Sequence, residues 1–174
     1  NKTKGHYHPL VSNGSLSYPE VYQVISGQAL FLLQRYREKP DQIVENYLIK
    51  AKQGQQTVMP PNFGHVTINL GPKPLVMANW VEANFESDYT AYQELKGASY
   101  YLLQNKPYQI MKNANYQKVP LLKRLKPKEQ PQFGLEFDTA IYNLVKNNIF
   151  QINFMRQPQK YDLSIDHLYS KLKN

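Results

Sequence analysis

The sequence has 174 residues, which is enough for one domain with a sizeable core and too short for two ordinary domains. It contains no cysteine, so disulfides and thiolate metal sites are excluded and a reducing cytoplasm is the expected compartment. No segment has the length and apolar character of a membrane span or of a signal peptide, so we expect a soluble protein without a membrane partner.

The formal net charge is +8 at pH 7, which raises the question of nucleic-acid binding. Much of the excess of lysine lies beyond residue 97, while the first half of the chain is more balanced. A basic run without a recognised module is usually a solvated face, so we expect no nucleic-acid partner. A basic protein also suits a sugar-phosphate substrate, because positive charge attracts the phosphate group.

Residues 1–125 are expected to form short strands separated by turns. The apolar runs 21–25 and 29–33 flank Ser26-Gly27, and together they are predicted to form a hairpin. A short polar segment, 89–95, is the helix candidate of this region. Further strands are expected at 42–49, 57–59, 66–70 and 75–81, and a second hairpin at 100–103 and 108–111. Many short strands with regularly spaced turns indicate an all-β sandwich or barrel.

The composition changes after residue 125. Charge and proline dominate 126–131, which indicates a linker. Beyond it, 139–145 has apolar residues at helical spacing, and Asp162 can cap a second short helix. We therefore expect a barrel over 1–125 and, over 126–174, a linker with a small helical extension. His167 falls in this extension, where a surface or packing role is expected.

Three of the four histidines of the chain belong to two motifs. His6 and His8 are two residues apart, so on a strand both imidazoles point to the same face and can reach one ion. Such a pair alone is more often a half-exposed strand face than a metal site. The metal interpretation is favoured by Glu20 and His65, which stand in the blocks Glu-x6-Gly and Gly-x5-Pro-x4-His-x3-Asn.

The two blocks resemble the paired motifs of the cupin barrel. In both, glycine or proline supplies the tight turn that neighbouring strands need. The resemblance implies an all-β cupin fold, which is a double-stranded β-helix or jelly-roll barrel, with one metal ion bound by His6, His8, Glu20 and His65. Imidazole and carboxylate ligands suit a divalent transition metal rather than calcium. We expect iron, with manganese, nickel and zinc as alternatives.

A closer resemblance is to the cupin-type glucose-6-phosphate isomerases best known from archaea. It spans residues 2 to about 118 and is carried by Thr-Lys-Gly-His-Tyr-His at 3–8, Pro-Glu-Val-Tyr at 19–22, Pro-Pro-x-x-x-His-x-Thr-x-Asn at 60–69 and Asp-Tyr at 88–89. The resemblance implies a metal-dependent aldose–ketose isomerase that interconverts glucose 6-phosphate and fructose 6-phosphate. It assigns Glu20 as catalytic residue, and it assigns substrate binding to Thr3, Gly5, Tyr22 and Tyr89.

The chain also departs from those enzymes. The segment between His8 and Glu20 is longer, with 12–15 expected as the tip of an extended hairpin, and Ser87 stands where family members carry a histidine. The resemblance further implies a homodimer and an amino-terminal region before residue 1, so we expect the early part of the barrel to be missing from this sequence.

Two other functions remain open from the residues alone. The first is a cupin dioxygenase, because iron held by three histidines and a glutamate can bind oxygen. The second is a non-catalytic cupin that binds a metal or a sugar. For the isomerase, the sequence does not choose between proton transfer through an enediol and a hydride shift.

Overall fold

The computed structural model describes residues 1–12, 14–104 and 107–172. Its strands form two larger sheets and a separate hairpin. The smaller of the two has the order β4-β1-β6 and consists of β1 (Glu20–Ser26), β4 (Gln56–Met59) and β6 (Val76–Trp80). The larger has the order β10-β9-β3-β2-β5 and consists of β2 (Gln28–Tyr36), β3 (Ile43–Lys52), β5 (Gly64–Ile68), β9 (Lys123–Pro127) and β10 (Tyr169–Lys171). This architecture confirms the all-β prediction.

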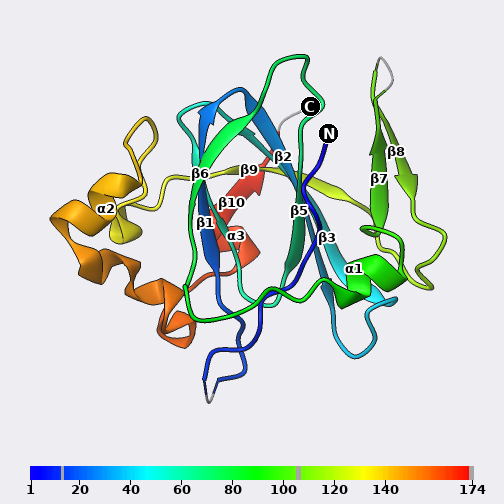
Figure 1. Ribbon diagram of the computed structural model, residues 1–174, viewed down its shortest axis with the longest axis horizontal. Helices are drawn as coiled ribbons and strands as arrows, with labels where there is room; N and C mark the ends of the chain where they lie inside the picture. The colour runs from blue at the N-terminus through cyan, green and yellow to red at the C-terminus, as the bar shows by residue number, and fades with distance from the viewer. Residues whose placement is uncertain (13, 105–106, 173–174) are drawn as a thin grey trace.

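The remaining elements flank the two sheets (Figure 1). At one side lie α1 (Thr90–Glu94), within the candidate segment 89–95, and the hairpin of β7 (Tyr100–Leu103) and β8 (Gln109–Lys112), which confirms the predicted second hairpin. At the other side lie α2 (Tyr142–Asn147) and the 3₁₀ segments η1 (Pro131–Phe133), η2 (Ile149–Met155) and η3 (Pro158–Lys160), which lead to α3 (Ile165–Leu168). None of the helices in the described residues is long and apolar enough to cross a bilayer.

The larger sheet is buried on both faces around β2 and β5. Phe31 and Leu33 pack between the two sheets with Val21 of β1, whereas Leu30 and Leu32 pack on the outer face beneath α1 and the β7–β8 hairpin. Successive residues of a strand point to opposite faces. The uninterrupted apolar run of β2 is therefore explained by two cores, one on each side, which is the usual reason for such a run.

The predicted hairpin of 21–25 and 29–33 is wrong. Both segments are strands, but β1 pairs with β4 and β6, while β2 pairs with β3 and β5. Gly27, with a φ of 91°, turns the chain out of one sheet and into the other. The segment at 10–17 does form a hairpin, since Leu10 pairs with Ser17. Asn13 at its expected tip lies outside the described residues.

The linker predicted for 126–131 begins inside a strand. β9 runs through Pro127, pairs in parallel with β3, and is joined on its other edge by β10 near the end of the chain. Phe154, Leu168 and Tyr169 are buried in the same core as Val21. The region after residue 125 thus adds the end of β9, the edge strand β10 and part of the core, besides the short helices that were expected.

Candidate metal centre

Three separate elements bring the four expected ligands together. Residues 2–6, called the amino-terminal strand below, lie along β5 through isolated bridges. There the N–H of His6 donates to the carbonyl of His65 at 3.2 Å, and the N–H of His65 donates to the carbonyl of His6 at 3.0 Å. His65 is opposite Leu33 of β2, so its side chain faces the core between the sheets. Glu20 opens β1 in the other sheet. The site therefore lies between the two sheets.

The side chains converge as the motifs predicted. One ligand atom from each of His6, His8, Glu20 and His65 lies within 4.8 Å of the others. Glu20 Oε2 is 3.1 Å from His65 Nε2 and 3.5 Å from His8 Nε2. The ring of His6 is 4.4 Å from that of His65 and 5.1 Å from that of His8, between centroids. This cluster could hold a metal ion.

Hydrogen bonds prepare two of the imidazoles for ligation. His8 Nδ1 is 2.9 Å from the carbonyl of Tyr18, and His6 Nδ1 is 3.3 Å from the carbonyl of Lys4. Carbonyl oxygens only accept, so each Nδ1 carries the proton and each Nε2 keeps a lone pair for a cation. Metal-binding histidines commonly have such a second partner.

Unpartnered buried atoms are the strongest sign that a cation fits here. Among the described residues, Glu20 Oε2 and both ring nitrogens of His65 are buried without a hydrogen bond of normal geometry, although Glu20 Oε2 and His65 Nε2 face each other at 3.1 Å. Leaving a buried polar atom unpartnered costs about 1–3 kcal/mol. A cation between the carboxylate and the imidazoles would satisfy Glu20 Oε2 and one nitrogen of His65 at once, so the donor set matches the divalent transition metals expected from the motifs.

The pKa values also favour ligation at neutral pH. Burial, followed by repulsion from His65, lowers the pKa of His6 to about 4, and the same two causes lower the pKa of His8. Burial raises the pKa of Glu20, but interactions with His65, Asn79 and Tyr22 outweigh it and leave that pKa lowered. His6 and His8 are therefore neutral while Glu20 is ionised at neutral pH, which is the protonation state that binds metal.

Two of the four expected substrate residues lie beside the cluster. Tyr22 faces Glu20, and its ring centroid is 6.0 Å from that of His65. Burial and the charge of Glu20 raise the pKa of Tyr22, so its hydroxyl remains a donor. The ring of Tyr89 is 5.4 Å from that of His6. A backbone pair between Tyr7 and the residue before Tyr89 holds that loop in place.

Thr3 and Gly5 hold the amino-terminal strand against its neighbours. The hydroxyl oxygen of Thr3 accepts a hydrogen bond from the N–H of Thr67 at 3.0 Å, which leaves the hydroxyl hydrogen free to donate. Gly5 is buried, and a Cβ at this position would overlap the ring of Tyr92 in α1. Glycine is therefore required here for close packing of α1.

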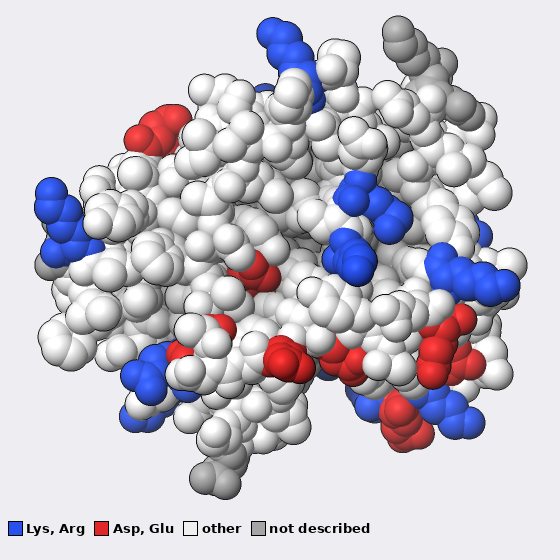
Figure 2. Space-filling view, in the orientation of Figure 1, with Lys and Arg blue, Asp and Glu red and all other residues white. Residues whose placement is uncertain are grey.

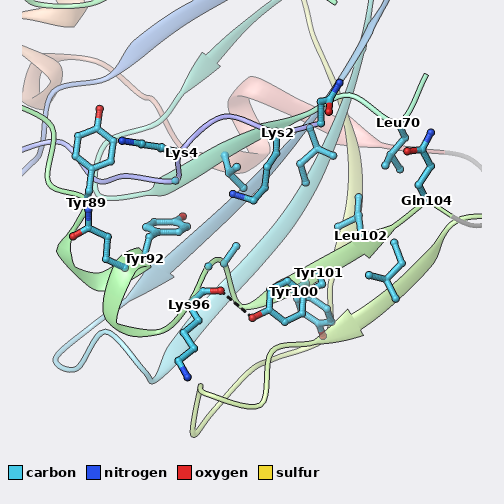
Figure 3. Close-up of a pocket in the computed structure, with 18 residues that line it drawn as sticks. Lys2, Lys4, Leu70, Tyr89, Tyr92, Lys96, Tyr100, Tyr101, Leu102 and Gln104 are labelled. Carbon is cyan, nitrogen blue, oxygen red and sulfur yellow. Dashed lines mark hydrogen bonds between the residues drawn. The ribbon is translucent and has the colours of Figure 1, made fainter. Parts of the chain in front are cut away.

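A cavity of about 550 Å³ lies on the outer side of the amino-terminal strand (Figure 3). Gly5 and Tyr89 line it together with lysines, tyrosines and the outer face of β5, but none of the four ligands does. Lys4 extends toward Tyr89, with its Nζ 6.0 Å from the ring centroid. Tyr89 therefore lies next to both the cavity and His6 of the cluster. Basic side chains gather over this part of the surface (Figure 2).

Sequence reasoning missed residues that complete the site. Asn79 Nδ2 donates to Glu20 Oε1 at 2.6 Å. The ring of Phe85 packs on His8 at 4.7 Å between centroids, and Tyr18 stacks on Phe85 at 5.2 Å. The available signal for Asn79 was a polar residue within the otherwise apolar run 75–81. No motif includes Phe85.

Two facing sheets that enclose three histidines and a glutamate define this chain as a cupin with a candidate metal centre. The family model described as "Glucose-6-phosphate isomerase (GPI)" matches residues 1–119. The chain therefore belongs to the glucose-6-phosphate isomerase family, in its cupin-type form, and is an aldose–ketose isomerase. Among curated proteins, no match to the chain was found.

Proposed function

We propose that this isomerase depends on one divalent transition metal per chain, bound by His6, His8, Glu20 and His65, and that it interconverts glucose 6-phosphate and fructose 6-phosphate. The observation that carries the proposal is the buried cluster in which Glu20 Oε2 and the nitrogens of His65 have no other partner within the described residues. Iron is our first choice, and manganese, nickel and zinc are the alternatives. When bound, such an ion supplies Lewis acidity at the substrate carbonyl.

Glu20 is proposed to carry the hydrogen between C1 and C2. From open-chain glucose 6-phosphate it takes the proton of C2 and returns it to C1, while the hydroxyl proton of O2 passes to O1. Glu20 is suited by position, because it is the carboxylate of the cluster. Its lowered pKa opposes basicity, so proton transfer requires a weak bond between Glu20 and the ion.

The remaining expected residues are proposed to bind the substrate. The Tyr22 hydroxyl, held protonated beside Glu20, can donate to a sugar oxygen. Tyr89 lies beside His6 and can line the sugar. The free hydroxyl hydrogen of Thr3 and the backbone at Gly5 are proposed to bind the phosphate. The exposed ammonium of Lys4, near Tyr89, adds a positive charge on the same side.

A metal-reconstitution assay tests the proposal. The protein is stripped with a chelator, reloaded separately with iron, manganese, nickel or zinc, and assayed in both directions under anaerobic conditions. We expect no turnover in the stripped protein and recovery with at least one metal. Equal turnover before and after stripping would refute metal dependence, and oxygen consumption by the iron form would favour a dioxygenase instead.

A further inference from the structure

The side chain of Asn79 reaches the buried carboxylate from the solvent side. Asn79 lies on β6, the edge strand of the smaller sheet, opposite Tyr22 of β1. Its side chain is exposed, whereas Glu20 is only 3% exposed. The hydrogen bond from Asn79 Nδ2 to Glu20 Oε1, at 2.6 Å, therefore joins a surface residue to the interior of the site.

This hydrogen bond makes the two oxygens of Glu20 unequal. Oε1 accepts from Asn79, while Oε2 faces His65 Nε2 at 3.1 Å and His8 Nε2 at 3.5 Å. The terminal torsion of a glutamate is broad and nearly two-fold, so the side chain itself has little preference for either orientation. Asn79 supplies the preference, because it offers a donor to one oxygen on the side away from the histidines.

We propose that Asn79 is a positioning residue that keeps Glu20 a one-oxygen ligand. By holding Oε1 outside the cluster, Asn79 leaves only Oε2 for a metal and keeps a coordination position open for the substrate. The inference rests on the proposed function to the extent that it requires a metal at the cluster. It extends that function with a residue of β6 that none of the motifs contains.

The benefit of this arrangement follows from coordination chemistry. A carboxylate can bind through one oxygen or through both, and a two-oxygen mode would fill a position that a sugar oxygen needs. Catalytic metal sites retain an open position, and hydrogen bonds to the ligating carboxylates fix their orientation. Replacing such a hydrogen-bonding partner typically costs about 10- to 100-fold in metal affinity or activity.

Three substitutions of Asn79 separate its functions. Asn79→Ala removes the donor, Asn79→Asp keeps the shape but replaces the donor by a like charge, and Asn79→His keeps an N–H near the same place. Asn79 is exposed, so none of these changes opens a cavity in the core. Asn84→Ala is the matched control, because Asn84 is also exposed and donates to a glutamate, Glu82 Oε1, at 3.0 Å.

The experiment combines a spectroscopic and a kinetic measurement. Each variant is loaded with Co(II), whose visible absorption depends on coordination number, and its affinity is measured by chelator competition. Turnover is then measured at metal saturation with each sugar phosphate. We expect Asn79→Ala and Asn79→Asp to shift the spectrum toward higher coordination and to lower kcat by about 10- to 100-fold with KM near that of the wild type. Asn79→His should keep much of the wild-type Co(II) spectrum and of the wild-type kcat, and Asn84→Ala should match the wild type.

Two results would overturn the inference. An unchanged Co(II) spectrum and affinity in Asn79→Ala would show that Glu20 needs no help from Asn79. A rise in KM with unchanged kcat would assign Asn79 to substrate binding instead. The spectroscopic measurement does not need turnover, so it decides the role of Asn79 even if the wild-type protein fails to isomerise and the proposed function fails with it.

Discussion

Replacing Glu20 by glutamine tests the proposed chemistry most directly. The change removes the negative charge of the side chain and its ability to accept a proton, while the shape of the side chain is nearly preserved. General acid–base assistance is typically worth about 100- to 10,000-fold. Each tenfold change in rate corresponds to about 1.4 kcal/mol, so the barrier should rise by about 3–5.5 kcal/mol. We expect this loss in kcat at metal saturation, in both directions of the reaction.

The structure also predicts how the variant binds metal. In the wild type, Glu20 Oε1 accepts from Asn79 and Oε2 faces His65 and His8. A glutamine has only one oxygen, so its NH₂ group must face either the imidazoles or Asn79 Nδ2. Asn79 is exposed and can turn its amide to present Oδ1, which leaves the glutamine oxygen free for the metal. Metal affinity should therefore fall by about 10- to 100-fold, and excess metal should restore saturation.

The assay follows conversion in both directions with the metal site saturated, and it includes substrate carrying deuterium at C2. Glu82→Gln is the control, because Glu82 is a hydrogen-bonded glutamate outside the cluster. Full activity in saturated Glu20→Gln would refute the role of Glu20 as a base. Transfer of the deuterium from C2 to C1 without exchange, together with a smaller loss, would favour a hydride shift.

Four other predictions address the site and its supports. His65→Ala should lower metal affinity steeply, and unchanged metal content would remove His65 from the site. In metal-free protein, the pKa of His6 near 4 lies below its ordinary value of 6.5, so the folded state binds fewer protons and stability should fall as the pH drops from 6.5 toward 4. Urea unfolding at pH 5 should show a loss of at most about 2 kcal/mol in the free energy of unfolding, and the loss should be smaller in His6→Gln. Gly5→Ala should cost about 1–3 kcal/mol, because its Cβ overlaps Tyr92, whereas Gly71→Ala meets neither a ring nor the backbone and should be nearly neutral in thermal unfolding. We further propose that the chain forms a homodimer through a strand edge such as β6, where Val76 is exposed; sedimentation as a monomer at micromolar concentration would contradict this.

The convergence of the four side chains could be predicted from sequence because local geometry places them. Alternation along a strand sets His6 and His8 on one face, and the spacing around His65 places it at the start of β5, just after the double proline. Glu20 was predicted from its motif, and the structure brings its side chain to those of the three histidines. Each of these predictions depends on a short stretch of chain and on a turn whose residues are diagnostic.

The errors concern interactions between distant segments. Ser26-Gly27 resembles a hairpin turn, but which strands pair is decided by packing of the whole barrel, and Gly27 instead connects two sheets. The 126–131 segment looked like a linker because of its lysines and prolines. β9 buries only Leu125 and Pro127 and exposes the residues around them, so its charged face concealed a strand. Asn79 was missed because its hydrogen-bond partner, Glu20, lies 59 positions away in the sequence.

None of the four expected ligands lies in the carboxy-terminal region, yet this region supports the sheet that holds Glu20. Gln23 of β1 donates to the carbonyl of Thr139 at 2.8 Å and accepts from the N–H of Ile141 at 3.0 Å. The indole N–H of Trp80, next to Asn79 on β6, donates to the carbonyl of Ile141 at 3.2 Å. Gln56 of β4 also donates to Thr139, so one short segment is bonded to all three strands of the smaller sheet. Because Glu20 faces its histidines across the space between the sheets, these bonds help to fix that separation, and the region after residue 125 thereby contributes to the geometry of the site.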